Sequence, residues 1–189
     1  MRRLPALAAA LIIVLFSACE WPEPPLPAPN SAIDHRLLGV WELPNRQSVR
    51  LTITSLGKDR YSVSLEGRGE YNQRQVWRLE GYHTDVEGIR LVSLELKEVI
   101  SGGVTKKIPD GRQHRWTCLS YELSNDGGLR PRYLAREIFP VHEGADGALT
   151  ITGKQIYERL KIYAADRSYW REHLFTTDEE KTIFRKQPN

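Results

Sequence analysis

Hydrophobic and polar residues alternate along much of the chain between residues 39 and 138. In the clearest segment, Val49, Leu51 and Ile53 alternate with charged and hydroxyl residues. Alternation with a period of two is typical of a β-strand with one buried side and one solvent-facing side. Segments of this kind predict strands at 49–54, 61–65, 76–82, 89–99, 116–123 and 129–138, with a closing strand at 182–185.

The longest of these strands, at 89–99, places Leu94 and its alternate neighbours on one side and Leu91 on the other. Residues 125–128, Asn-Asp-Gly-Gly, predict a hairpin turn because they accept the positive φ angles of tight turns. Residues 100–113 contain glycines, a proline and several basic residues but few hydrophobic ones, which predicts an exposed loop. Pro131 predicts a sheet edge or a β-bulge within its strand.

The period changes from 2 to 3.6 near residue 152. Thr152 and Gln155 have the spacing of a capping box, and Ile156, Leu160 and Tyr163 then fall on one face of a helix. We therefore predict an α-helix at 153–165, between the strands and the closing strand.

This order of elements is that of an antiparallel up-and-down β-barrel. The chain is predicted to be mainly β, with one late α-helix before the last strand. A β-sandwich is the alternative, because it also contains short strands with alternating patterns.

Gly39 and Trp41 form a Gly-x-Trp motif at the start of the first predicted strand. The motif and the order of elements resemble those of the lipocalins. This resemblance implies that the Trp41 indole closes the base of the barrel and packs against a cation from Arg185 or Lys186. The alternative is that Trp41 is an ordinary core residue. Residues 151–170 also resemble the C-terminal part of uncharacterised bacterial lipoproteins. Because those proteins have no assigned activity, this resemblance does not indicate a function.

The N-terminal nineteen residues have the pattern of an export signal. Arg2 and Arg3 precede an apolar segment at 4–16, and two small residues follow before Cys19. Residues 16–19, Phe-Ser-Ala-Cys, resemble the lipobox of bacterial lipoproteins, which implies that Cys19 becomes the acylated first residue, with fatty acids such as palmitate holding it on a membrane. The alternatives are an ordinary secretory signal or a membrane helix, for which about 20 apolar residues are needed.

Residues 20–31 contain five prolines, which exclude helix and central strand and predict an extended tether. The predicted organisation is a signal peptide at 1–18, the lipidated cysteine and tether at 19–32, and a β-barrel domain at 33–189. Glu20 follows the cysteine where aspartate would favour the inner membrane. The lipoprotein resemblance therefore implies a protein anchored in the bacterial envelope, at the outer membrane and facing the periplasm.

Charge and cysteine content narrow the possible partners. The chain carries a formal net charge of +3, and the predicted signal contributes Arg2 and Arg3 to it. Such a nearly neutral mature chain argues against a nucleic acid partner. Cys19 and Cys118 are the two cysteines, so acylation of the first leaves no disulfide in the domain. Cys118 lies in an apolar run and is predicted to be buried and unreactive.

The sequence offers no pattern of catalytic residues. Its five histidines are far apart and lack the spacing of metal ligands. His83 and Asp85 are interpreted as a solvent-facing pair at a strand end. Because no motif for an activated nucleophile occurs either, we predict a protein that is not an enzyme and needs neither a metal nor a cofactor.

Aromatic and aliphatic residues of the predicted strands suggest two functions. Tyr61, Trp77, Leu94 and Trp116 are predicted to line the barrel interior. If they leave space, the barrel binds a small apolar molecule or a lipid; if they fill it, the protein is a scaffold that binds another envelope protein. In the second case, residues 100–113 are the predicted contact surface. In both cases the membrane is a partner through the lipid anchor.

Overall fold

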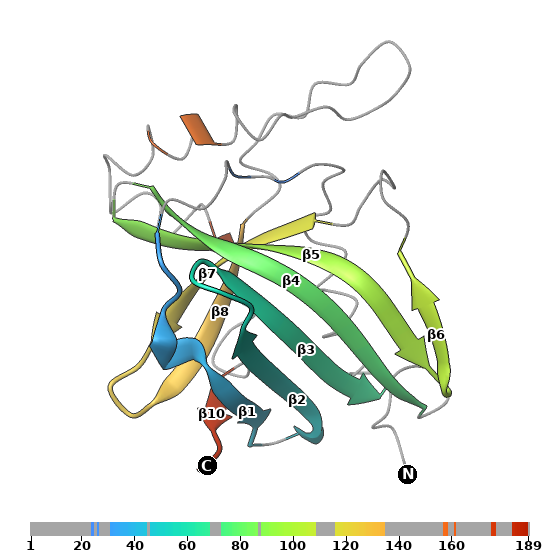
Figure 1. Ribbon diagram of the computed structural model, residues 1–189. Coiled ribbons are helices and arrows are strands. Elements are labelled where there is room, and N and C mark those ends of the chain that lie inside the picture. Colours follow the sequence, from blue (N-terminus) through green and yellow to red (C-terminus); the bar gives the residue numbers. More distant parts are fainter. Residues whose placement is uncertain are drawn as a thin grey trace.

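The computed structural model describes Pro24, Leu26 and residues 31–44, 46–68, 73–86, 88–108, 116–134, 157–158, 161, 175–176 and 183–188. Within this part, one short 3₁₀ helix and ten strands are present (Figure 1). They are η1 (His35–Leu37), β1 (Gly39–Leu43), β2 (Arg46–Ser55), β3 (Arg60–Arg68), β4 (Arg74–Val86), β5 (Ile89–Ser101), β6 (Val104–Lys107), β7 (Trp116–Leu123), β8 (Gly128–Leu134), β9 (Phe175–Thr176) and β10 (Phe184–Lys186). No helix among these residues has the length and hydrophobicity needed to cross a bilayer.

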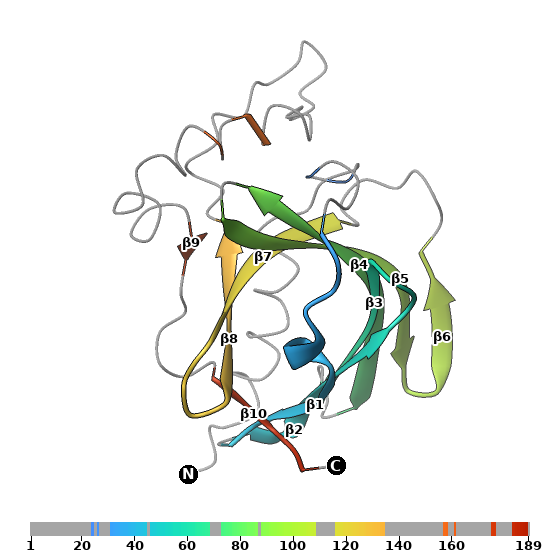
Figure 2. The ribbon, with the colours of Figure 1, turned by 60° about the vertical axis from the view of Figure 1, so that its left-hand side comes forward.

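The strands form one antiparallel sheet that closes into a barrel. Strands β1 to β5, β7 and β8 pair in sequence order, and β10 pairs with β1 on one side and with β8 on the other. Figure 2 shows the sheet curving round, with η1 between its two sides. Outside this ring of eight strands, β6 pairs with β5 and β9 pairs with β8. The predicted up-and-down barrel is confirmed, and the alternative of a β-sandwich is wrong.

Alternate side chains of the ring strands point into the barrel. One row of inward residues crosses four strands: Tyr61 on β3 pairs with Gly81 on β4, which pairs with Leu94 on β5, which pairs with Thr117 on β7. A Cβ atom at residue 81 would overlap Leu94 Cδ2, so the glycine lets the Leu94 side chain lie across β4. The residues next to this row along each strand face outward, because successive side chains alternate between the two faces.

Part of the outer face of β4, β5 and β7 is buried as well. Tyr82, Leu91 and Cys118 face outward, yet each is at most 4% exposed. The Tyr82 hydroxyl donates a hydrogen bond of 2.6 Å to the backbone oxygen of Leu26. The predictions that Cys118 is buried and that Leu91 and Leu94 lie on opposite sides are confirmed. These strands therefore bury both faces over part of their length.

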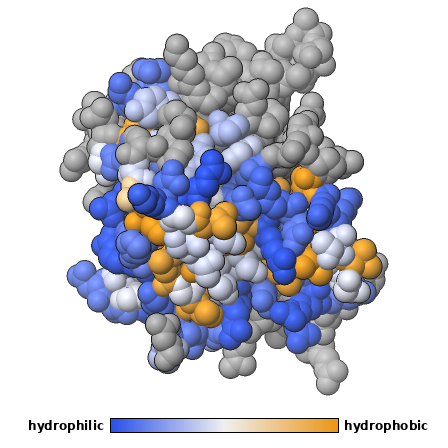
Figure 3. Space-filling view, in the orientation of Figure 1, coloured by the Kyte–Doolittle hydropathy of each residue, from blue (hydrophilic) through white to orange (hydrophobic). Residues whose placement is uncertain are grey.

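The outer face of β1 to β3 and of the first half of β4 is polar. Figure 3 shows hydrophilic side chains over much of this side of the molecule, with hydrophobic ones between them. Ion pairs join neighbouring strands there, among them Glu42 with Arg50, Glu66 with Arg74, and Arg78 on β4 with Glu98 on β5. Exposed pairs of this kind contribute only about 0 to 1 kcal/mol each. The stability of the barrel therefore depends on its interior.

The two predicted connections have different outcomes. The turn at 125–128 is confirmed: Gly127 has a φ of +76°, and the Ser124 N–H donates to the Gly128 oxygen where β7 turns into β8. The predicted loop at 100–113 is wrong for residues 100 and 101, which end β5, and for residues 104–107, which form β6. Residues 109–113 lie outside the described part. Gly102 and Gly103 both have positive φ, as a tight two-residue hairpin turn requires. Because β6 is exposed along its whole length, no hydrophobic alternation marks it as a strand.

The sheet edge or β-bulge predicted for Pro131 is not confirmed, because β8 has neighbours on both sides of the sheet. Pro131 on β8 pairs with Tyr121 on β7. On the other side of β8, the described pairings with β10 end at Leu129 and those with β9 begin at Tyr133. Proline lacks a backbone donor, and at this position the described strands require none.

Part of the predicted C-terminal organisation lies outside the described residues. Residues 157, 158 and 161 have helical backbone, and the rest of the predicted helix at 153–165 lies outside the described part. The end of the predicted strand at 129–138, from residue 135 on, also lies outside it, as do residues 1–23 with the predicted signal and Cys19. Residues 175 and 176 form β9, which is too short for a recognisable period. The predicted closing strand is confirmed as β10.

Candidate functional site

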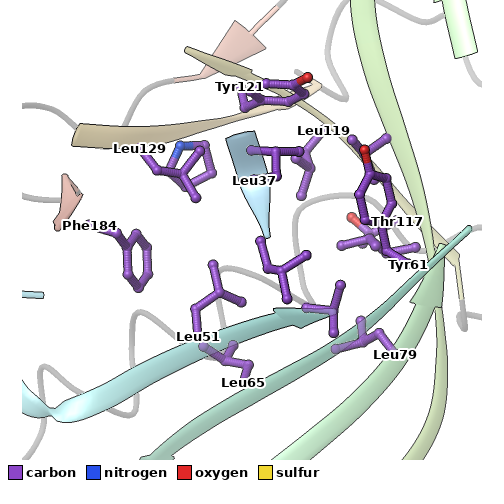
Figure 4. Close-up of a pocket in the computed structure, with 15 residues that line it drawn as sticks. Leu37, Leu51, Tyr61, Leu65, Leu79, Thr117, Leu119, Tyr121, Leu129 and Phe184 are labelled. Atoms are coloured by element: carbon purple, nitrogen blue, oxygen red, sulfur yellow. The ribbon is translucent and has the colours of Figure 1, made fainter. Parts of the chain in front are cut away.

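A cavity of about 100 Å³ lies inside the barrel (Figure 4). Its wall is formed by η1 and by every ring strand except β1. The side chains are almost all hydrophobic, because the inward positions of these strands carry aliphatic and aromatic residues, among them Leu51, Val63, Leu79 and Phe184. The barrel is thus filled in part, and an apolar space remains within it.

The four residues predicted to line the interior have three different positions. The cavity wall includes Tyr61 and Leu94. Trp77 belongs to the buried core around the cavity but not to its wall. Trp116 lies beside the inward-facing Thr117 and therefore faces outward, where its ring packs edge-on against Tyr82 at a centroid distance of 6.0 Å. The prediction for Trp116 is corrected, because both faces of β7 are buried and alternation does not identify the inner one.

Two contacts hold Trp41 in β1, and Gly39 leaves room for one of them. Its Nε1 donates a hydrogen bond of 2.8 Å to the backbone oxygen of Leu37 in η1. The Lys186 Nζ atom lies 5.5 Å from the centre of the indole ring, within the range of a cation–π interaction. Gly39 has a φ of +131°, and a Cβ atom there would lie 2.8 Å from Lys186 Cε. Glycine at position 39 therefore provides both the backbone conformation and the space for Lys186.

Arg185, the other cation that the sequence suggested for Trp41, has a different partner. Its guanidinium pairs with the Asp126 carboxylate at 2.7 Å, in the turn between β7 and β8. Hydrogen bonds from Ser124 and Arg185 lower the pKa of Asp126 to about 2. Arg185 therefore links β10 to this turn, and Lys186 is the residue that packs over the indole.

A polar cluster closes the barrel at the end where η1 lies, which we call the η1 end. Its centre is the Asp34 carboxylate, only 8% exposed, which accepts hydrogen bonds from Arg36 Nη2 (2.6 Å), Arg90 Nη1 (3.0 Å) and the Tyr121 hydroxyl (2.9 Å). The hydrogen bonds from Arg36 hold the pKa of Asp34 far below its usual value. Asp34 is thus a buried anion that ties η1 to β5 and β7.

His83 extends this cluster across the η1 end. Its ring stacks on Tyr121 with an interplanar angle of 8°, and its Nδ1 lies 3.1 Å from the Tyr61 hydroxyl and 3.3 Å from the Ala32 oxygen. Burial lowers the pKa of His83, so its neutral form is favoured. The interpretation of His83 and Asp85 as a solvent-facing pair is wrong for the histidine, which is 3% exposed.

Asp34, Thr117 and Tyr121 are residues of this region that sequence reasoning missed, and it gave His83 a solvent-facing position. Asp34 and His83 are separated by 49 positions, and only the closed barrel brings them to the same end. Thr117 had no usable signal, because both faces of its strand are buried and only the pairing with Leu94 on β5 identifies the inner one.

Comparison with known proteins provides no relative from which a function could be inferred. No protein-family model, curated protein or solved structure matches this chain. Within the described residues, no group of three or more histidine, cysteine, aspartate or glutamate side chains is arranged to hold a metal ion.

Proposed function

We propose that this protein is a lipid-anchored protein of the bacterial envelope whose barrel binds a small apolar molecule or part of a lipid chain. The observation that carries this proposal is the hydrophobic cavity of about 100 Å³ inside a closed barrel. For comparison, an engineered apolar cavity of 150 Å³ in another protein stays dry and binds benzene or xenon. The volume therefore suits a slender hydrocarbon. The cavity weighs against the alternative of a scaffold with a completely filled barrel.

The polar cluster at the η1 end supports the same proposal. Leu37 of η1 contributes to the cavity wall, and the neighbouring Asp34 fixes η1 through Arg90 and Tyr121. When a ligand enters a cavity whose walls are already ordered, the protein loses little conformational entropy. The cluster thus holds the wall in place before binding.

Filling the cavity is expected to abolish ligand binding. In Leu119→Trp, a larger inward side chain would occupy the space and displace two or three methylene groups of a hydrocarbon. At about 0.8 kcal/mol per methylene, the dissociation constant for n-hexane should rise about 15- to 60-fold. Methyl NMR titration of residues 19–189, which contain every described residue, measures this constant.

Leu56→Trp is the matched control, because Leu56 lies in the turn between β2 and β3 and is 47% exposed. This variant should bind n-hexane as tightly as the natural chain. If Leu119→Trp also retains full affinity, the probe binds elsewhere and the proposal fails. Leu119→Phe is a milder variant for the case that the indole prevents folding.

Acylation of Cys19 has its own expected result. Cells that produce the protein should incorporate labelled palmitate into it, and the protein should sediment with membranes. Cys19→Ser should lose both properties, whereas Cys118→Ser should keep them, because Cys118 is buried within the barrel wall. Label and sedimentation that persist in Cys19→Ser would refute the lipid anchor.

A further inference from the structure

Thr117 is a residue of the cavity wall, and its hydroxyl group is unpaired within the described residues. Its side chain belongs to the cavity wall (Figure 4), and the residue is only 6% exposed. Within the described structure, the Thr117 Oγ1 atom has no hydrogen-bond partner. A buried hydroxyl without a partner destabilises a protein unless another group satisfies it.

The other polar groups of the wall already have partners. The Tyr121 hydroxyl donates to Asp34, and the Tyr61 hydroxyl accepts from the Asp34 N–H and lies within hydrogen-bond distance of His83. Both hydroxyls thus belong to the polar cluster at the η1 end. Thr117 is the remaining wall residue with a side-chain hydroxyl, and within the described residues this hydroxyl has no hydrogen-bond partner.

The cavity is also electrically neutral. None of the described residues in its wall carries a charged side chain. Arg36 and Arg90, the cations of the polar cluster, both pair with Asp34. Burial raises the pKa of Tyr61 to about 12, so its hydroxyl stays uncharged at neutral pH. A ligand carboxylate inside would have no counter-ion, and a buried unpaired charge is strongly unfavourable.

We propose that Thr117 makes the cavity selective for an amphipathic molecule with one uncharged hydrogen-bonding group, such as an alcohol, ester or amide, and against the ionised carboxylate of a fatty acid. This inference rests on the proposed function and names the chemical class of its ligand. The hydrocarbon part contacts the aliphatic wall, and the polar group bonds to Thr117 Oγ1.

The test compares 1-hexanol with n-heptane, which has the same number of non-hydrogen atoms. Methyl NMR titration of residues 19–189 gives both dissociation constants for the natural chain, Thr117→Val and Thr117→Ser. In Thr117→Val the constant for 1-hexanol should rise about fivefold, the effect of one neutral hydrogen bond. The constant for n-heptane should stay the same or fall, and Thr117→Ser should bind 1-hexanol like the natural chain.

Hexanoate provides the test of charge. Its affinity for the natural chain should fall about tenfold per pH unit above its own pKa, because only the protonated acid enters, while the affinity for 1-hexanol stays constant. If Thr117→Val changes the dissociation constants for 1-hexanol and n-heptane by the same factor, the role of Thr117 is overturned. If the affinity for hexanoate does not depend on pH, the charge selectivity is overturned. If the natural chain binds neither 1-hexanol nor n-heptane, the proposed function itself fails.

Discussion

Trp41→Ala is expected to lower the free energy of unfolding by about 4 kcal/mol. The indole is 2% exposed and packs within the core cluster, and removing a buried tryptophan leaves a large cavity. The variant also leaves the Leu37 backbone oxygen without its hydrogen bond and Lys186 without its aromatic partner. Because small domains are stable by only about 5 to 15 kcal/mol, this loss would threaten folding itself.

Urea unfolding followed by far-ultraviolet circular dichroism measures this effect without relying on tryptophan fluorescence. Lys186→Met, which removes the charge and keeps an apolar side chain, should cost about 0.5 to 1 kcal/mol. The loss of stability in Trp41→Phe should lie between those of Trp41→Ala and Lys186→Met. This variant keeps an aromatic ring but loses the hydrogen bond to Leu37. A loss below 1.5 kcal/mol in Trp41→Ala would contradict the structural role of Trp41.

Asp34→Asn is the second variant with a large expected effect. It keeps the shape of the side chain but removes the charge that pairs with Arg36 and Arg90. Charge-assisted hydrogen bonds contribute about 1.5 to 3 kcal/mol each when one group is buried, so we expect a loss of about 2 kcal/mol at pH 7. Since Asp34 fixes η1, whose Leu37 lines the cavity, ligand exchange should also become faster.

The pH dependence of this effect follows from the lowered pKa of Asp34. The unfolded chain takes up a proton near the ordinary pKa of about 3.9, before the folded chain does. The contribution of Asp34 is therefore fully present above that value and is lost as the pH falls toward the folded pKa. Urea unfolding from pH 7 to pH 3 should show the natural chain and Asp34→Asn converging in stability as the pH falls.

Asp126→Asn is the matched control for Asp34→Asn. Asp126 also pairs with an arginine, but its side chain is 63% exposed in the turn between β7 and β8. Asp126→Asn should lower the free energy of unfolding far less than Asp34→Asn does. Equal effects at the two positions would mean that the polar cluster at the η1 end does not stabilise the fold.

The barrel could be predicted because its inner wall is formed from local patterns. At Val49, Leu51 and Ile53, one face is buried and the other carries ion pairs, so period two appears directly in the sequence. The turn at Asn125 to Gly128 needs residues that accept positive φ, and these are equally visible. Such features depend only on neighbouring residues.

The errors arise where burial does not alternate. Strand β7 is buried on both faces, so the sequence could not show that Thr117 faces the cavity and Trp116 the outside. Strand β6 is exposed on both faces, so Lys106 and Lys107 resembled a loop. Pairing with β5 decides which face of β7 is the inner one, and it also makes residues 104–107 a strand. Such pairing is not a local property of either segment.

The candidate site was still harder to predict than the fold. The polar cluster joins Asp34, Tyr61, His83 and Tyr121 from four parts of the chain. Taken one at a time in the sequence, each of these four residues looks like an ordinary strand or turn residue. Their contacts result from the closure of the barrel, and the size of the cavity depends on how completely all inward side chains fill it.

Native mass spectrometry of the protein purified from the cell envelope tests the central claim most directly. We expect the natural chain to carry a small molecule of lipid type, with an uncharged polar group, and the Leu119→Trp variant to lose it while Leu56→Trp retains it. The claim would be contradicted if the natural chain showed only its own acylated mass and gained no ligand on addition of n-hexane or 1-hexanol.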